Sequence, residues 1–600
     1  MNNVIYIENS DKNVPVYPVI FKKTKVDTLL TSLNGLNLNS TYAPDKESNR
    51  FVENHYKRNY AHILFGIGHS HIAKDFVYQM VENDLLIIIE PNVDLFEGLR
   101  DRGHLDELLN LKNVFILVGF EFVEIDREIK YVIENGYLGF TEFIISPNYE
   151  KIYPQYIKTI REIIKQSTSL STMNIATMTV FSQIWQKNLL YNLKDIWKSE
   201  SFVEYEGKLD CPVIIASSGP SLTKQLDILR EVRESNCALI IAAGSTINPL
   251  LKAGIKPHII VSVDGGEANW NHFKSIDYDD IPLFYSLAVH KNIPASHGGL
   301  KVAFNPQEDM LTSWVEDIAS RKVGTVDGGA SVANFSLDVA YKISSGPITL
   351  IGQDLAYTGD QTHAKGNRNY KKVIELENSR KYTSVEGYYG GQVRSDYQFL
   401  SMKKVFENMI KSFRIKGDNR SVYNSTEGGA AIDGFEKVPF KHFVGEFSHL
   451  SYEQEFNKLF QKLEGTIESN KDVIEKNVSN EKMKLHEAKS LCENAIEILN
   501  KTDKYKLIEQ TKLDELDEID SKVNVYTESK ILHFITMPVN FRINYKYRQI
   551  KEESEAQQLE RILNKSEALY KGIYDAINTT VEFIDEVFPE GVEKCERNSN

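Results

Sequence analysis

Residues 212–222 read PVIIASSGPSL and are the clearest indication of the fold in the central part of this sequence. The first five residues of this stretch predict a buried strand, and the small polar residues after them lead through a Gly-Pro corner into a helical segment. Small side chains let backbone N–H groups approach a phosphate closely, and the start of a helix adds partial positive charge. Ser221 can cap that helix and also touch the ligand. The turn is therefore either a phosphate-binding turn or a purely structural connection.

The same pattern of an apolar strand followed by a helical segment recurs along the central region. The further strand-like segments are Ala238–Ala242, His258–Val263, Pro282–Ser286, Lys301–Phe304 and Ile348–Ile351. Strands that alternate with helical segments form parallel sheets, and ligands bind such sheets at the carboxyl ends of the strands. Residues 205–445 are therefore predicted to form a Rossmann-like sheet domain.

The N-terminal region repeats the alternation. Apolar segments at 62–65, 85–89 and 113–118 are separated by a helical stretch at 73–81 and another at 93–109. A long helical pattern from Tyr153 to Ile196 then leads to the central region. Residues 1–200 are predicted to form a second Rossmann-like domain with a helical linker.

The C-terminal region has a different pattern. From about residue 451 glycine almost disappears until Gly572, and apolar residues fall at helical spacing. Residues 451–600 are predicted to form an all-helical domain, which either packs on the rest of the protein or docks an acceptor. The predicted fold class is thus α/β, with two Rossmann-like sheet domains followed by an all-helical C-terminal domain. Several domains are expected in 600 residues, because single cores stop growing near ~250–300 residues.

The composition narrows the partners and the compartment. The formal net charge of -14 disfavours binding to nucleic acid or to anionic lipid. The first residues lack the basic and apolar regions of a signal peptide, and no apolar run approaches the ~20 residues that span a bilayer. The four cysteines lack CxxC spacing, so neither a disulfide framework nor a zinc site is predicted. We expect a cytoplasmic protein that does not insert into membranes.

Polar residues follow the predicted central strands and supply the candidate site. Thr246 and Asn248 follow the second strand, Asp264 follows the third, and Gln353 and Asp354 follow the strand at 348–351. Asp264 can bind a hydroxylated ligand or a metal, or it can simply cap the next helix. His363 lies in a polar loop with Lys365 and Arg368, which is how a general base is often presented, although a loop histidine can also be merely solvated.

The N-terminal glycines form an incomplete dinucleotide motif. Gly66 and Gly68 lack the third glycine in register, since position 71 is His, and Glu90 ends the next strand where a ribose-binding acid would lie. Either a vestigial nucleotide site or a structural turn fits this pattern. HExxH, GxSxG, GxxxxGK[ST] and paired CxxC motifs are absent from the sequence, and no metal site is predicted.

Four segments together resemble the motility accessory factor (Maf) family of glycosyltransferases. They are SSGPSL (217–222), AAGSTINPLLKAGIKPHIIVSVDGG (242–266), GQDLAYTGDQTHAKG (352–366) and STEGGAAIDG (425–434), and FGIG…IIIEPN (65–92) resembles the family's N-terminal domain. The resemblance implies a central domain similar to bacterial sialyltransferases, whose Gly-Pro-Ser-Leu turn binds a cytidine nucleotide.

The resemblance also implies an activity. The donor would be a CMP-activated nonulosonic acid of the pseudaminic or legionaminic type, and the acceptors would be Ser and Thr hydroxyls of flagellin. On this basis Ser218, Gly219, Pro220 and Ser221 lie at the donor phosphate. Thr246, Asn248, Gln353 and Asp354 complete the donor site, and His363 and Asp264 are the catalytic candidates. No cofactor is required, because CMP is already a good leaving group.

Two other functions stay open at this point. The central motifs also resemble an archaeal-type pterin diphosphokinase, which would use ATP and magnesium. The chain can also be read as a flagellin-binding accessory factor with a degenerate site and no activity.

Overall fold

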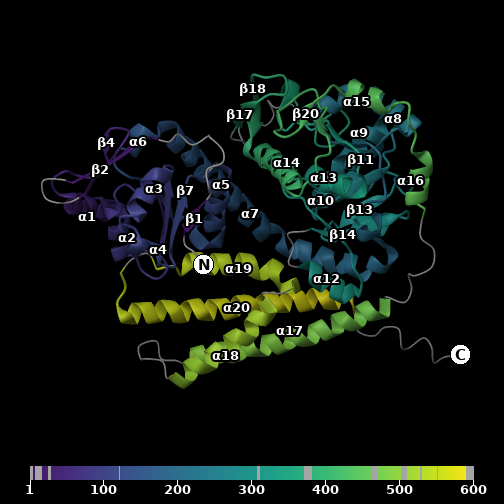
Figure 1. The fold of residues 1–600 in the computed structure, drawn as a ribbon. Coiled ribbons are helices and arrows are strands. Elements are labelled where there is room, and N and C mark those ends of the chain that lie inside the picture. Colours follow the sequence, from purple (N-terminus) through teal and green to yellow (C-terminus); the bar gives the residue numbers. More distant parts are fainter. Residues whose placement is uncertain are drawn as a thin grey trace. The chain divides into compact units, whose positions relative to one another are not determined.

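The structure is a computed structural model, which describes residues 4–6, 17–23, 29–120, 122–306, 311–370, 382–461, 471–501, 510–527, 530–549 and 552–589. The chain forms two compact units (Figure 1). Unit 1 consists of Met1–Thr177, Thr502–Leu507 and Val539–Leu569. Unit 2 consists of Met178–Lys501, Ile508–Pro538 and Tyr570–Asn600.

Unit 1 is built on a parallel sheet with the strand order β1-β7-β6-β5-β8. Its strands are β1 (Val4–Tyr6), β5 (Ala61–Phe65), β6 (Leu85–Glu90), β7 (Val114–Val118) and β8 (Thr141–Ile145). The helices along the chain are α1 (Pro44–His55), α2 (His71–Gln79), α3 (Val93–Arg100), α4 (Asp106–Leu109) and α5 (Phe122–Val132). Every residue of β5 is buried, so both faces of the sheet are covered, as expected for a parallel sheet.

Two features of unit 1 differ from the sequence prediction. The single helical stretch predicted at 93–109 is wrong, because α3 and α4 are separate and Gly103, with a φ of +72°, lies in the turn between them. A small antiparallel sheet precedes α1 and was missed, since its strands are short and mostly half exposed. These strands are β2 (Val19–Lys23), β3 (Leu29–Leu33) and β4 (Leu36–Asn37).

Glu90 at the end of β6 has a structural role. Its fully buried carboxylate accepts hydrogen bonds from Ile67 N (2.9 Å), Asn92 N (2.8 Å) and the Tyr149 hydroxyl (2.6 Å). Burial raises the pKa of Glu90 to about 7, although these three donors act in the opposite direction. The glycine turn after β5 is therefore held by Glu90, in the place where a ribose-binding acid had been considered.

Unit 2 is built on a larger parallel sheet with the order β15-β14-β13-β12-β11-β10-β16-β19-β20, and β9 pairs with β14. Its strands are β9 (Glu200–Ser201), β10 (Val213–Ala216), β11 (Leu239–Ala243), β12 (Ile259–Ser262), β13 (Leu283–Ser286), β14 (Lys301–Pro306), β15 (Thr325–Val326), β16 (Ile348–Ile351), β19 (Val422–Asn424) and β20 (Glu436–Lys437). All six strands predicted from the central region are present. A hairpin of β17 (Tyr382–Glu386) and β18 (Gln392–Asp396) lies outside this sheet.

Side-chain alternation along the strands of unit 2 forms one core on each face of the sheet. Ile215 and its neighbours pack against α13 (Val332–Ile343) and α14 (Tyr397–Ile415). Ile214 and its neighbours pack against α8 (Leu226–Ser235) and α15 (Phe440–Phe447). These helices therefore cover both faces, and the carboxyl ends of the strands stay at the sheet's edge.

The C-terminal region is helical. Its long helices are α17 (Lys471–Asn500), α18 (Gln510–Thr527), α19 (His533–Lys546) and α20 (Glu555–Val587), and they contribute to both units. Within the described part of the chain, no helix has the length and apolar character needed to cross a membrane. The predicted fold class, two parallel α/β sheets followed by a helical region, is confirmed.

Candidate functional site

The strand order of unit 2 places a crevice at the end of β10. The chain moves from β10 through β11, β12 and β13 to β14 on one side, and then returns to place β16 on the other side of β10. Ligands of parallel α/β sheets bind where the strand order reverses in this way. The Ser-Gly-Pro-Ser turn that follows β10 lies at this reversal.

The turn after β10 is organised by the residues that follow β16. Ser221 donates through its backbone N–H (3.1 Å) and its hydroxyl (2.6 Å) to one oxygen of Asp354. Ser217 donates its hydroxyl to Gln353 Oε1 at 2.5 Å. Asp354 is 2% exposed, and burial raises its pKa above the ordinary value while Ser221 lowers it. Gln353 and Asp354 thus hold the turn, and their contact with a ligand stays a prediction.

The expected helix cap at Ser221 is wrong. The turn continues as a 3-10 helix over Pro220–Lys224, with Gly219 at the N-cap position and no side-chain cap. The Ser221 hydroxyl is instead committed to Asp354. A helix of one turn satisfies few backbone groups, so the turn depends on these side-chain bonds.

One backbone N–H of the turn has no acceptor within the described part of the chain. The N–H groups of Ser217 and Gly219 donate to Ile351 O (2.9 Å) and Gly352 O (2.8 Å), and that of Ser221 donates to Asp354. Pro220 has no N–H. The N–H of Ser218 has no acceptor among the residues that the structure describes. Ser218, which is half-buried, is therefore the turn residue best placed to bind an anion.

The polar loop that contains His363 lies against this turn. Ala364 N donates to Ser218 O at 2.8 Å, and Asn367 Nδ2 donates to Ser245 Oγ at 3.1 Å. Ser245 Oγ is also 3.2 Å from Ser218 Oγ. The loop thereby brings half-buried His363 next to the residues that follow β10 and β11, which are about 120–145 positions earlier in the chain.

A second group of polar side chains lies beside the turn after β11. His272, on α10 (Glu267–Phe273), is in contact with Asn248 Nδ2 (3.4 Å) through one ring nitrogen and with Asn369 Nδ2 (3.3 Å) through the other. Thr246 is fully buried and donates its hydroxyl to Ala243 O at 2.8 Å, so it supports its own turn. Asn369 belongs to the loop of His363, and its place in that polar loop is the signal that could have identified it.

Arg368 affects His272. Its guanidinium donates to Asn271 O and Ser275 Oγ. Burial lowers the pKa of His272 below its ordinary value, and the charge of Arg368 lowers it further. His272 is therefore held as neutral imidazole, which can accept a proton.

Asp264 lies after β12 with an uncommitted carboxylate. Its backbone oxygen accepts bonds from Asn269 Nδ2 (2.8 Å) and His290 N (3.2 Å). Within the described ranges no residue forms a hydrogen bond with the carboxylate, and the side chain is open to solvent. The surrounding protein atoms nonetheless raise its pKa through desolvation. This carboxyl group is therefore accessible at the carboxyl end of β12 and yet has a raised pKa, a combination that is found at functional sites.

Two further histidines of the central region lie at opposite ends of the sheet. His258 lies at the amino end of β12, where it accepts from Ile240 N at 2.9 Å and where burial lowers its pKa to about 3. It therefore faces away from the crevice. His290 follows β13 at the carboxyl end, and its Nε2 is 3.0 Å from Glu267 Oε2.

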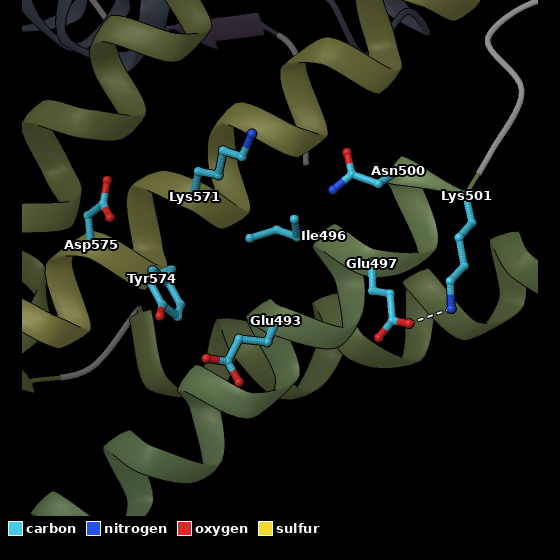
Figure 2. Close-up of a pocket in the computed structure, with 8 residues that line it drawn as sticks. All are labelled: Glu493, Ile496, Glu497, Asn500, Lys501, Lys571, Tyr574 and Asp575. Atoms are coloured by element: carbon cyan, nitrogen blue, oxygen red, sulfur yellow. Dashed lines mark hydrogen bonds and ion pairs between the residues drawn. The ribbon is translucent and has the colours of Figure 1, made fainter.

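A separate recess occurs in the helical region of unit 2 (Figure 2). It has a volume of about 590 Å³ and lies between residues of α17 and α20. Its lining residues are Glu493, Ile496, Glu497, Asn500, Lys501, Lys571, Tyr574 and Asp575, and Lys501 pairs with Glu497. None of the sequence-predicted site residues lines it. In the described residues, no group of three or more His, Cys, Asp or Glu side chains could hold a metal ion.

Comparisons with known proteins agree with this architecture. Residues 187–360 match the family described as 6-hydroxymethylpterin diphosphokinase MptE-like. A solved MAf glycosyltransferase from Magnetospirillum magneticum AMB-1 superposes with a TM-score of 0.63 at 14% identity, covering 96% of this chain and 94% of that chain. No curated protein matches significantly. The resemblance to Maf proteins is confirmed at the level of the fold: over nearly its whole length, this chain has the fold of a MAf glycosyltransferase.

Proposed function

We propose that this protein is a glycosyltransferase that moves a nonulosonic acid from a CMP-activated donor to Ser or Thr hydroxyls of flagellin. The observation that carries the proposal is the Ser-Gly-Pro-Ser turn at the reversal of a parallel sheet, in a chain with the fold of a MAf glycosyltransferase. The sequence resemblance supplies the donor and the acceptor.

In this proposal the donor phosphate binds at Ser218. The N–H of Ser218, which no described residue accepts, lies at the crevice together with the hydroxyl groups of Ser218 and Ser245. Three small donors of this kind suit the oxygens of a phosphodiester, which needs no metal when the donors are already positioned. Asn248 lies beside them and faces the nucleotide or the sugar.

The proposed reaction is a direct displacement. The acceptor hydroxyl oxygen attacks the anomeric carbon, the bond from that carbon to the phosphate oxygen breaks, and CMP leaves with the electron pair. A base removes the hydroxyl proton as the new bond forms, which contributes roughly 10²–10⁴-fold to the rate. His363 and Asp264 are the candidates for this base, and no cofactor takes part.

The MptE-like match favours a second candidate function. It covers the turn after β10, the turn after β11 and Asp264, and the enzyme named in it transfers diphosphate. In that case ATP with Mg²⁺ would occupy the same crevice, and the phosphates would again meet the Ser218 turn.

Nucleotide binding to the full chain separates these functions. The transferase predicts that CMP raises the melting temperature and that ATP with Mg²⁺ does not, because only a ligand that binds the native state stabilises it. Ser218→Ala should weaken the CMP effect, whereas Ser235→Ala should not, since Ser235 is exposed on α8 and bonds only to its own helix. A shift with ATP and Mg²⁺ alone would support the diphosphokinase. A shift with neither nucleotide would support the accessory factor without activity.

A further inference from the structure

Three histidines meet at the start of α2 in unit 1. The His69 ring stacks on the His71 ring with 4.6 Å between centroids and meets the His104 ring edge-on at 5.0 Å. His69 is 4% exposed, and neither ring nitrogen meets the geometry of a hydrogen bond with a described residue, although the backbone oxygens of His69 and Leu29 lie near enough to raise its pKa. A buried polar group without a partner costs free energy, so native proteins rarely keep one unless a ligand or water completes it.

Backbone donors that have no acceptor among the described residues lie at the same place. The N–H groups of His71, Ile72 and Ala73 belong to the first turn of α2 and have no acceptor among the described residues. The first N–H of the helix that has an acceptor is that of Lys74, which donates to Ser70 O (2.9 Å). Ser70 occupies the N-cap position with a φ of +77° and makes no side-chain cap. The start of a helix in this condition attracts anions, because several N–H groups and the positive end of the helix dipole point outward.

The dinucleotide position itself is blocked. Gly68 N donates to the Tyr149 hydroxyl (3.2 Å), and Ile67 N donates to Glu90. The Tyr149 ring also lies so close to Gly66 that a Cβ there would be 2.5 Å from it. A ligand would therefore lie beyond the glycine turn, over the first turn of α2 and beside His104.

The charges around the histidines favour an anion over a metal ion. Burial lowers the pKa of His104, and the charges of Lys74, His71 and Arg102 lower it further. Burial lowers the pKa of His69 to about 4, with His71 and His104 acting in the same direction, while carbonyl oxygens of His69 and Leu29 act against it. Two carboxylates are also close, Glu107 at 3.3 Å from Lys74 Nζ and Asp45 at 3.2 Å from His71 Nδ1. Lys74 and Arg102 place cationic groups beside His104, and each of the two carboxylates pairs with a neighbouring side chain.

We propose that the first turn of α2, together with His69, His71, His104 and Lys74, forms a second binding site that takes a phosphate group. A phosphate has enough acceptor oxygens for the unpaired amides and for a neutral imidazole N–H at once. The site lies in unit 1 and is independent of the proposed transferase site in unit 2.

Protection from chemical modification tests this site directly. The full chain is treated with diethyl pyrocarbonate in the presence of inorganic phosphate or of KCl at equal ionic strength, and each modified histidine is quantified by peptide mass spectrometry. At a phosphate concentration about ten times Kd, modification of His71 and His104 should be about tenfold slower. His55 is the control in the same unit, because its Nδ1 bonds to Phe51 O at 2.7 Å on α1.

Two variants make the test specific. His69→Phe keeps a buried ring but removes both nitrogens, and it should abolish the protection of His71 and His104. Lys74→Met removes a partly exposed cation and should weaken the protection several-fold, which keeps the test available if the first variant does not fold. Ser218→Ala changes only the proposed donor site in unit 2 and should leave the protection of His71 and His104 unchanged. The phosphate site can therefore be confirmed even if the transferase proposal fails. Equal modification rates with and without phosphate, or equal protection in the folded His69→Phe protein, would overturn the proposal.

Discussion

At the scale of the residue, Gly219 shows how close packing selects a residue type. Its φ of -68° is open to any amino acid, but a Cβ would lie 2.2 Å from an Asp354 oxygen and 2.4 Å from Gly352 O. We predict that Gly219→Ala lowers the free energy of unfolding by about 1–3 kcal/mol, because the strand and turn must move apart. Urea unfolding measures this change.

Gly445→Ala is the matched control for Gly219. Gly445 lies inside α15, and a Cβ there would meet nothing within 4 Å. The substitution should be neutral or stabilising by about 0.4–1 kcal/mol, since it restricts only the unfolded chain. If Gly219→Ala matched Gly445→Ala in stability, the close contact with Asp354 would be refuted. If a Gly219 variant loses nucleotide binding, the first explanation is a distorted turn, and a lost contact between Gly219 and the nucleotide is the second.

Asp264 offers a prediction that depends on pH. The pKa of Asp264 is higher in the folded protein than in the unfolded chain. The unfolded chain therefore loses the Asp264 proton at a lower pH, and the free energy of unfolding falls as the pH rises between the two pKa values. Asp264→Asn should therefore melt at a higher temperature than the unchanged protein at pH 7–8, and the difference should vanish below about pH 4, where both states are protonated. Thermal unfolding across this range measures the effect.

The same variant tests the assignment of the base. If Asp264 accepts the proton, Asp264→Asn lowers flagellin modification by roughly 10²–10⁴-fold with CMP binding retained. His363→Ala should then have a much smaller effect. The opposite order of the two variants would assign the base to His363, and full modification in both would show that neither residue is the base.

At the scale of the element, the C-terminal helices are part of the packing of unit 2. Gln186 on α7 (Pro154–Lys194) is fully buried and donates through Nε2 to Ile531 O (2.7 Å) and to Thr580 Oγ1 (2.9 Å). Asn477 on α17 donates to Ile318 O (3.1 Å) on α12 (Leu311–Ala319). The C-terminal helices therefore supply hydrogen-bond partners for polar groups on α7 and α12.

A truncated chain tests this dependence. We predict that a fragment of residues 1–461 does not reach a stable fold, because it leaves Gln186 and the faces of α7 and α12 uncovered. Soluble yield and thermal melting by circular dichroism measure this outcome. Gln186→Ala is the milder variant and should cost about 1–3 kcal/mol through the unpaired groups it leaves. A fragment that melts cooperatively at the temperature of the full chain would show that the helices are an independent addition.

At the scale of the whole molecule, the helix α7 belongs to both units. Ile157 and Ile160 lie in the core of unit 1, while Leu190 and Leu193 are buried in unit 2. The helical spacing of its apolar residues correctly predicts a long helix here, and α7 has 41 residues. What the spacing did not show is that each end is a core element of a different unit.

Local patterns were enough to predict the main sheets. The segments around Ile63, Ile88 and Ile214 are short, mainly apolar and bounded by turn residues, so each is predicted as a buried strand of a parallel sheet. The hairpins β2–β3 and β17–β18 were not predicted, because their strands carry polar residues and are largely half exposed. Their pairing depends on what they pack against.

The amino-acid sequence was sufficient to predict the two parallel α/β sheets, the helical C-terminal region and the positions of the polar turns. These features follow from hydrophobic periodicity and turn chemistry, which act within a few residues. Only the tertiary structure decided that Asp354 holds the Ser221 turn, that Arg368 acts on His272, and that His69 meets His104. Each of these contacts joins residues that are distant along the chain, because strand order and loop closure, which no local pattern encodes, bring them together.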